Sequence, residues 1–207
     1  MTFPMAFFLA SALSMPTPSS PPGRWVTDTD YPKSARERKE AGTVNFEIVI
    51  SPSGRVIQCS ITQSTGSAEL DQMTCYLLYA RATFEPASDE SRNPISGMYR
   101  GKLTWHLPGQ KRLPPPPPLN RPPDIELEVE KLYNGAREAR VGIFARIDDK
   151  GQVAYCEPLV DDPETVKLAT IACGQAKALT PAPIRDADGK PIPMVRTFSV
   201  RFQANSL

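Results

Sequence analysis

The alternation of apolar and polar residues predicts short strands in two separate stretches of the chain. In the first stretch, apolar side chains occupy every second position of residues 43–50. In the second stretch, Val141, Ile143, Ala145 and Ile147 follow the same alternation. A period of two is typical of a strand with one buried face, so we expect two half-buried strands here.

Each expected strand runs into a turn and then into a second strand. The turn sequences are Ser51-Pro52-Ser53-Gly54 in the first stretch and Asp148-Asp149-Lys150-Gly151 in the second. Glycine at the end of such a cluster supplies the positive φ that a hairpin needs. Residues 55–61 and 152–156 are therefore predicted to form the returning strands.

The two stretches continue in parallel beyond the hairpins. Helices are predicted at residues 68–81 and 163–177, because apolar residues such as Leu70, Met73 and Leu77 recur at helical spacing. A last strand is expected at 98–107 and at 194–203, and a helix before each first strand at 32–39 and 125–133. The chain is thus predicted to be α+β, with one α-β-β-α-β unit occurring twice. Each unit would form a three-stranded antiparallel sheet with two helices.

A run of five consecutive prolines, residues 114–118, separates the two predicted units. Such a run favours stiff polyproline II, so residues 108–123 are predicted to be a linker. The expected domains are then residues 25–107 and 124–207. Domains this small have modest cores and often depend on additional cross-links.

The four cysteines occupy equivalent places in the two units. Cys59 and Cys156 lie on the second strands, and Cys75 and Cys173 lie on the helices that follow. We expect the disulfides Cys59–Cys75 and Cys156–Cys173, each stabilising its unit by roughly 3 kcal/mol. Free buried thiols and a metal site are the alternatives, although neither pair has the Cys-x₂₋₄-Cys spacing of structural zinc sites.

The N-terminal residues 1–24 predict a signal-like segment followed by a disordered tail. The apolar run at residues 3–15 is shorter than the roughly 20 residues of a membrane-spanning helix. It ends in Ala10-Ser11-Ala12, as a signal-peptide core does, although no Lys or Arg precedes it. The alternatives are a disordered tail or a mis-assigned start, with the true signal or anchor upstream. Residues 16–23 are rich in proline and serine and are expected to be unstructured.

Charge and candidate catalytic groups argue against nucleic-acid binding and against catalysis. The 24 basic and 23 acidic side chains nearly cancel, so no basic binding surface is indicated. The acidic pairs Asp148-Asp149 and Asp161-Asp162 fall in predicted turns, where aspartate is common for local reasons. The single histidine, His106, has no partner near it in the sequence. We expect no catalytic residue, cofactor, metal ion or small-molecule substrate.

Several short motifs of the first unit occur together and in a fixed order. On these residues the first unit resembles the C-terminal domain of the TonB energy-transducer family. The second unit keeps Gly151-Gln152-Val153 and Pro181-Ala182 but lacks the other motifs, so it is interpreted as a divergent copy. The motifs of the first unit are Tyr31-Pro32-x-x-Ala35, Gly42-x-Val44-x-Phe46, Gly54-Arg55-Val56, Ser64-Thr65-Gly66-Ser67-x-x-Leu70-Asp71 and Phe84-x-Pro86-Ala87.

The resemblance implies a role in protein recognition in the cell envelope of a Gram-negative bacterium. Members of the family couple the inner-membrane proton gradient to outer-membrane transporters, through a membrane helix that docks with the ExbB–ExbD motor. Their C-terminal domain captures the short TonB-box peptide of the transporter by strand addition at the last strand of its sheet. The corresponding residues here are Tyr99, Arg100, Gly101, Lys102, Leu103, Thr104 and Trp105.

This partner-binding strand has an alternating pattern of its own. Tyr99, Gly101, Leu103 and Trp105 are expected on one face, with the residues between them on the other. An alternative is that these residues only complete a core and that the second domain covers the edge. The predicted function is a periplasmic TonB-like module that binds outer-membrane transporter segments. The other possibilities are an energy transducer whose anchor is missing from this sequence and an envelope scaffold.

Overall fold

A computed structural model describes residues 12–107, 109, 122–159, 162–179 and 182–205. The start of the predicted signal segment, residues 1–11, lies outside the described residues, as does the proline run of the predicted linker. Among the helices that are described, none has the length and apolar character needed to cross a membrane.

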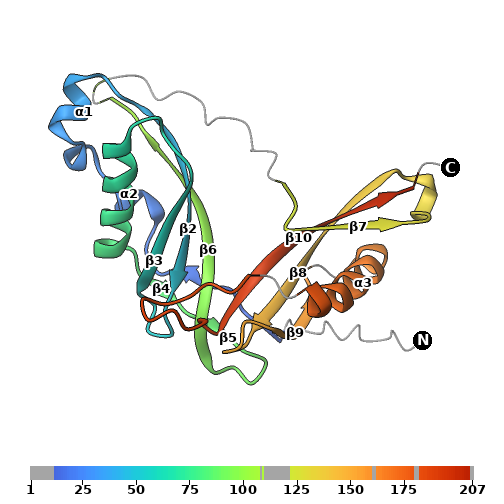
Figure 1. The fold of residues 1–207 in the computed structure, drawn as a ribbon. Helices are drawn as coiled ribbons and strands as arrows, with labels where there is room; N and C mark the ends of the chain where they lie inside the picture. The colour runs from blue at the N-terminus through green and yellow to red at the C-terminus, as the bar shows by residue number, and fades with distance from the viewer. Residues whose placement is uncertain (1–11, 108, 110–121, 160–161, 180–181, 206–207) are drawn as a thin grey trace, which may run out of the picture.

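In residues 25–107, here called the first unit, three antiparallel strands form part of an eight-stranded sheet of the described residues, and α2 packs against them (Figure 1). The separate three-stranded sheet predicted for each unit is therefore wrong. The strands of the first unit follow the spatial order β3-β2-β6. The helix α2 spans the residues predicted for it, 68–81. It begins at Ala68 because the Ser67 side chain caps its N-terminus by accepting a hydrogen bond from the Leu70 N–H. The main elements are α1 (Lys33–Glu37), β2 (Gly42–Ile50), β3 (Val56–Gln63), α2 (Ala68–Arg81) and β6 (Pro94–Trp105), with short strands β4 (Phe84–Glu85) and β5 (Ala87–Ser88) between the last two.

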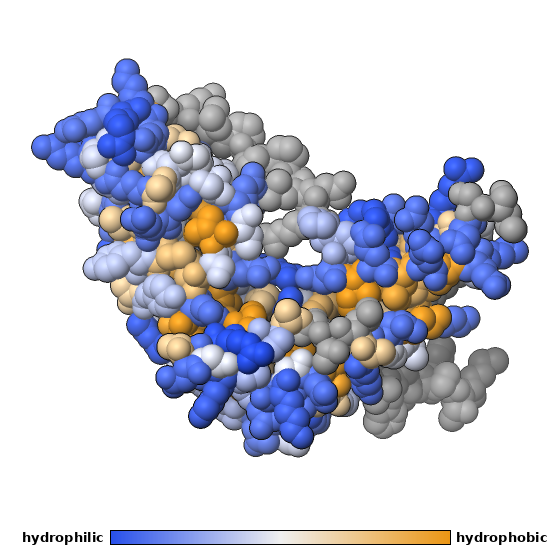
Figure 2. Space-filling model, in the orientation of Figure 1, coloured by the Kyte–Doolittle hydropathy of each residue, from blue (hydrophilic) through white to orange (hydrophobic). Residues whose placement is uncertain are grey.

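The second unit (residues 124–205) repeats the order strand, strand, helix, strand. Its elements are β8 (Glu138–Ile147), β9 (Val153–Pro158), α3 (Pro163–Leu179) and β10 (Met194–Ala204), with β8 between the other two strands. The helix α3 presents Ala169, Ala172 and Ala176 to the sheet, all fully buried. In Figure 2, hydrophobic residues of this unit lie in a band between hydrophilic outer layers.

Both predicted disulfides are present. The bond Cys59–Cys75 joins β3 to α2, and Cys156–Cys173 joins β9 to α3. The Cα atoms are 5.7 and 5.6 Å apart, within the usual range for a disulfide. Each bond ties the outer strand of a unit to its helix.

The two units share one sheet, because β10 of the second unit pairs with β6 of the first. The strands run parallel and pair only at Met194 with Ser96 and at Val195 with Gly97. Beyond this short contact they diverge, and the units spread apart from the junction (Figure 1). A bidentate ion pair also connects the two units, from the Arg146 guanidinium to the Glu90 carboxylate, with N–O distances of 2.6 and 2.8 Å.

The prediction of a helix at residues 125–133 is wrong. The chain there forms the strand β7 (Ile125–Val129), followed by a short 3₁₀ turn at Tyr133–Gly135. β7 pairs in parallel with residues 200–204 of β10. Its apolar residues Ile125, Leu127 and Val129 alternate with glutamates and pack on the core of the second unit. Pairing with β10 and burial of one face therefore stabilise a strand.

The expectation that residues 16–23 are unstructured is also wrong. β1 (Thr17–Pro18) pairs with β4, and a 3₁₀ turn follows at Pro22–Arg24. The segment is ordered because apolar residues at both ends are buried: Leu13 is 3% exposed and Trp25 is 2% exposed.

Candidate functional site

The predicted partner-binding strand lies at a sheet edge that is open over much of its length. On one side β6 pairs with β2 from Gly97 to Trp105. It also pairs with β5 at Pro94 and Ile95, and on the side away from β2 it pairs with β10 at Ser96 and Gly97. Within the described part of the chain, no strand pairs with this second edge beyond Gly97. Residues 98–105 therefore present main-chain groups that an added strand could use.

A groove of about 750 Å³ follows this open edge. β6 and the residues after it form one side, and the N-terminal stretch from Pro22 to Tyr31 forms the other. All seven residues of the predicted partner-binding strand line the groove, and so does His106. The other lining residues are Pro22, Gly23, Trp25, Val26, Thr27, Asp28, Tyr31, Asn45, Phe46, Leu107 and Gly109.

Aromatic residues form the apolar side of the groove. The ring centroid of Trp25 lies 5.4 Å from that of Phe84 and 6.3 Å from that of Tyr99. The Phe46 ring lies directly over Gly101, where an added Cβ would come within 2.4 Å of the ring. Glycine at this position therefore lets an aromatic ring cover β6 next to its open edge.

The predicted division of β6 into two faces agrees with the packing. Tyr99 and Leu103 pack on the core of the first unit, and Trp105 is buried there. On the other face, the Arg100 guanidinium donates to the Glu47 carboxylate at 2.6 Å, and the Lys102 side chain is exposed. The open edge thus runs between an apolar face and a charged one.

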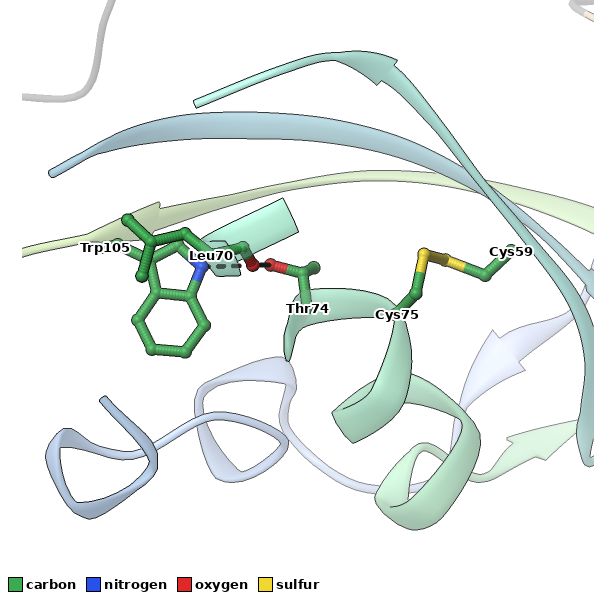
Figure 3. The surroundings of a disulfide bond; sticks show 5 residues. All are labelled: Cys59, Leu70, Thr74, Cys75 and Trp105. Carbon is green, nitrogen blue, oxygen red and sulfur yellow. Dashed lines mark hydrogen bonds between the residues drawn. A yellow bond between two sulfur atoms is a disulfide. The ribbon is translucent and has the colours of Figure 1, made fainter. Parts of the chain in front are cut away.

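Trp105 fixes the end of β6 to α2 (Figure 3). Its indole N–H donates to the Thr74 hydroxyl at 2.9 Å, and that hydroxyl donates to the Leu70 carbonyl at 2.8 Å. Thr74 is next to Cys75 of the disulfide in the helix. The same helix that the disulfide ties to β3 therefore also holds the end of the candidate binding strand.

Replacing Thr74 by valine tests this anchor. We expect Thr74→Val to lower the free energy of unfolding by about 1 to 3 kcal/mol, since the buried Trp105 N–H loses its acceptor. Thr170→Val on α3 is the matched control, because Thr170 also donates to a carbonyl four residues back but is exposed. Urea denaturation followed by circular dichroism measures both. Equal losses in the two variants would contradict the role given to Trp105.

An ion pair holds the N-terminal side of the groove against α2. The Arg81 guanidinium donates two hydrogen bonds of 2.6 Å to the Asp30 carboxylate. These bonds, with others from Thr27, lower the pKa of Asp30 from 3.8 to about 2. Since the folded state holds this carboxylate in its charged form, the interaction stabilises the fold at any pH above the ordinary pKa of aspartate.

The stability from this pair is expected to fall as the pH is lowered from about 4 towards 2. Solvent reduces the effect at this partly exposed pair, so we expect a contribution of about 1 kcal/mol. Melting temperatures of the protein and of Asp30→Asn, measured between pH 2 and 6, test this. The variant is expected to be less stable at pH 6, with the difference closing towards pH 2. A difference that stays constant with pH would refute the assignment.

The corresponding edge of the second unit is occupied by the chain itself. β7 pairs with Val200–Ala204 of β10, which correspond in register to residues 103–107 of the first unit. Asp124 reinforces the start of this pairing, because its N–H donates to the Ser199 carbonyl and its carboxylate accepts from the Ser199 N–H, both at 2.8 Å. The groove along β6 is therefore the more accessible of the two equivalent edges.

Of the acidic residues considered for catalysis, Asp148 and Asp162 have local structural roles. The Asp148 carboxylate accepts from the Lys150 and Gln152 N–H groups in the hairpin turn. Asp162 caps α3 by accepting from the Thr165 N–H at 3.0 Å, and its neighbour Asp161 lies outside the described residues. Among described residues, His, Cys, Asp and Glu do not gather into a group that could hold a metal ion.

Sequence reasoning missed Trp25 and Val26 as part of the site. The one feature of the sequence that could have indicated this wall is Trp25, a large aromatic residue that closely follows the proline- and serine-rich stretch predicted to be disordered. Tyr31 was in a motif, but its contact with Trp105, at 5.3 Å between ring centroids, is long-range. The wall of the groove thus depends on contacts that no local pattern encodes.

Comparison with known proteins gives one match. Neither the curated proteins nor the solved structures contain a match to this chain. Residues 27–107, which include β2, β3, α2, β6 and part of the N-terminal wall of the groove, match the family of the Gram-negative bacterial TonB protein C-terminal.

Proposed function

We propose that this protein binds an extended segment of an outer-membrane transporter by strand addition to β6. The observation that carries the proposal is the open edge at residues 98–105, which lies in a groove within the part of the chain that matches the TonB C-terminal family. That family consists of protein-interaction domains. Main-chain hydrogen bonds along β6 would supply affinity, and the aromatic wall would select side chains of the added strand.

The proposed location is the periplasm. The two disulfides support it, because such bonds form and persist in oxidising compartments. We further propose that the second unit is a divergent copy of the first, on the basis of its repeated element order and its equivalent disulfide. Since β7 occupies its edge, the second unit would support the first rather than bind a second segment.

A titration tests the proposal. The ligand is a synthetic peptide carrying the TonB-box segment of an outer-membrane transporter, and the control is a peptide of the same composition in scrambled order. Trp25 and Trp105 both line the groove, so their fluorescence reports occupancy. We expect a saturable change with one peptide bound per chain, and none with the scrambled peptide. Equal responses to both peptides, or no response to either, would overturn the proposal.

A further inference from the structure

The strands β6 and β10 separate directly after their two paired positions, and the place where they separate is here called the fork (Figure 1). From Gly97 onwards the open edge of β6 is on the side where β10 was paired. β10 gains its next partners only at Ser199, which bonds to Asp124, and along β7 beyond it. A segment that adds to the open edge of β6 therefore has one end at the fork.

Arg100 of β6 and Arg196 of β10 project from the same face of the shared sheet. Ser96 is paired with Met194, and paired residues of neighbouring strands have their side chains on one face. Because side chains alternate along a strand, Arg100 and Arg196 share the face of this pair. That face is opposite α2, since Tyr99 packs on the core beneath the helix. The two arginines therefore stand on the two sides of the fork.

A single carboxylate, that of Asp124, contacts both arginines. Its Oδ1 atom lies 3.3 Å from a guanidinium nitrogen of Arg100 and 3.7 Å from one of Arg196. Its Oδ2 atom accepts from the Ser199 N–H at 2.8 Å. Arg100 has a second partner in Glu47, at 2.6 Å. Arg100 is thus well paired, whereas the contact of Arg196 with Asp124 is longer than a hydrogen bond.

Arg196 is a buried cation with few partners. Its side chain is 13% exposed, and its Nε atom has no hydrogen-bond partner among the described residues. The guanidinium lies 4.4 Å from the ring centroid of Phe198. Burial lowers the pKa of Arg196 below the usual value for arginine, and the nearby charge of Arg100 lowers it further. A buried charge is costly unless it is paired and hydrogen-bonded, so a second carboxylate at Arg196 would be favourable.

We propose that the fork is a carboxylate-binding subsite, in which Arg196 and Arg100 bind an acidic side chain of the segment that adds to β6. This inference rests on the proposed function, because the added strand brings the carboxylate to the fork. A side chain of that strand on the face opposite α2 is a cross-strand neighbour of Arg100 and points towards Arg196. Opposite charges on neighbouring strands stabilise their pairing, and guanidinium groups can bind a carboxylate through two hydrogen bonds.

The subsite gives the second unit a part in recognition, because Arg196 belongs to β10. Main-chain bonds along β6 still supply the binding common to all segments, and the two arginines select segments that carry an acidic residue at the fork. Asp124 occupies the same donors in the free protein and therefore competes with the incoming carboxylate. The preference for an acidic residue is set by the difference between these two carboxylates.

The first experiment moves a single glutamate along the ligand. The probe is the transporter peptide with capped ends and with its acidic residues replaced by glutamine, and each variant peptide has glutamate at one position. Tryptophan fluorescence of the full chain measures binding. We expect glutamate at one position near an end of the peptide to tighten binding by about tenfold. The adjoining positions project from the opposite face, so glutamate there is expected to change binding by less than about twofold.

Variants of the protein then test the arginine. In Arg196→Gln the gain from glutamate is expected to disappear, while binding of the uncharged peptide is retained. Arg201→Gln is the matched control: the Nε of Arg201 on β10 also lacks a partner, but its guanidinium already donates to Glu126 at 2.6 Å. Asp124→Asn is expected to increase the gain, because it removes the competing charge while the amide oxygen can still accept from the Ser199 N–H.

Each result separates this proposal from the proposed function. Equal binding of all the peptides, or a gain from glutamate that survives Arg196→Gln, would overturn the carboxylate subsite and leave strand addition intact. If circular dichroism shows that Arg196→Gln does not fold, Asp124→Asn decides, and a gain that falls in this variant would refute the subsite. Failure of the proposed function is recognised differently, because no peptide of the set would then bind to β6, with or without glutamate.

Discussion

Removal of the Cys59–Cys75 disulfide is expected to lower the free energy of unfolding by about 3 kcal/mol. The bond closes a loop with a sequence separation of 16 residues, which restricts the unfolded chain. In the folded state it holds α2 against β3, and α2 holds the end of β6 through Thr74 and Trp105. We therefore expect Cys59→Ala/Cys75→Ala to lose affinity for the transporter peptide as well as stability. Urea unfolding and peptide titration measure the two effects.

The second disulfide provides the matched control. Cys156→Ala/Cys173→Ala removes a bond of nearly equal separation, 17 residues, from the second unit. We expect a similar loss of stability but retained peptide binding, because β9 and α3 do not line the groove along β6. If both double variants lose binding equally, the first unit does not carry the site alone. If neither loses stability, the cross-links do not stabilise the fold as described.

The second large effect is expected from a proline in the candidate binding strand. Lys102→Pro is expected to weaken binding of the transporter peptide at least tenfold, which corresponds to about 1.4 kcal/mol. Proline removes a main-chain N–H and interrupts strand pairing, while the Lys102 side chain lies outside the hydrophobic clusters of the first unit. Peptide titration by tryptophan fluorescence measures the loss, and circular dichroism shows whether the sheet is retained.

A proline in β3, the outer strand of the first unit farthest from β6, controls for general damage to the sheet. Ile57 of β3 is 48% exposed and lies where the β2–β3 pairing breaks register, so it has no paired partner in β2. Proline is tolerated at such irregular positions of outer strands. We expect Ile57→Pro to leave binding within about twofold, or about 0.4 kcal/mol. Equal losses in the two variants would show that β6 is not the strand that binds.

The elements with strong local patterns were predictable from the sequence. The alternation in residues 43–50, the turn ending at Gly54 and the spacing of Leu70 and Leu77 each correspond to an element of the first unit. The cysteine pairs were predictable for a related reason, since in each unit one cysteine falls on the strand after the turn and the other on the next helix. These features depend on residues close together in the chain.

The error at β7 came from assuming that the repeat extends to its first helix. Ile125, Leu127 and Val129 alternate with charged residues, which is itself the pattern of a strand. What no local pattern shows is that β10 offers an edge for this strand. A helix in the first unit and a strand in the second precede the same hairpin because their tertiary surroundings differ.

The order of residues 12–25 and the pairing of β6 with β10 could not be predicted, because both depend on contacts between residues far apart in the chain. Proline and serine favour disorder in isolation, but Leu13 and Trp25 gain enough buried area to order the residues around them. The pairing of β6 with β10 joins residues about a hundred positions apart through two register pairs. The wall of the groove along β6 therefore forms only through long-range contacts of the folded chain.

Amide hydrogen exchange at β6 tests the central claim most directly. Without ligand, the outward-facing amides of residues 98–105 are expected to exchange quickly, because no described strand pairs with them. With the transporter peptide bound, they are expected to exchange much more slowly, while the amides of β10 that pair with β7 are unchanged. Protection that appears elsewhere on the protein and leaves β6 unaffected would contradict strand addition at this edge.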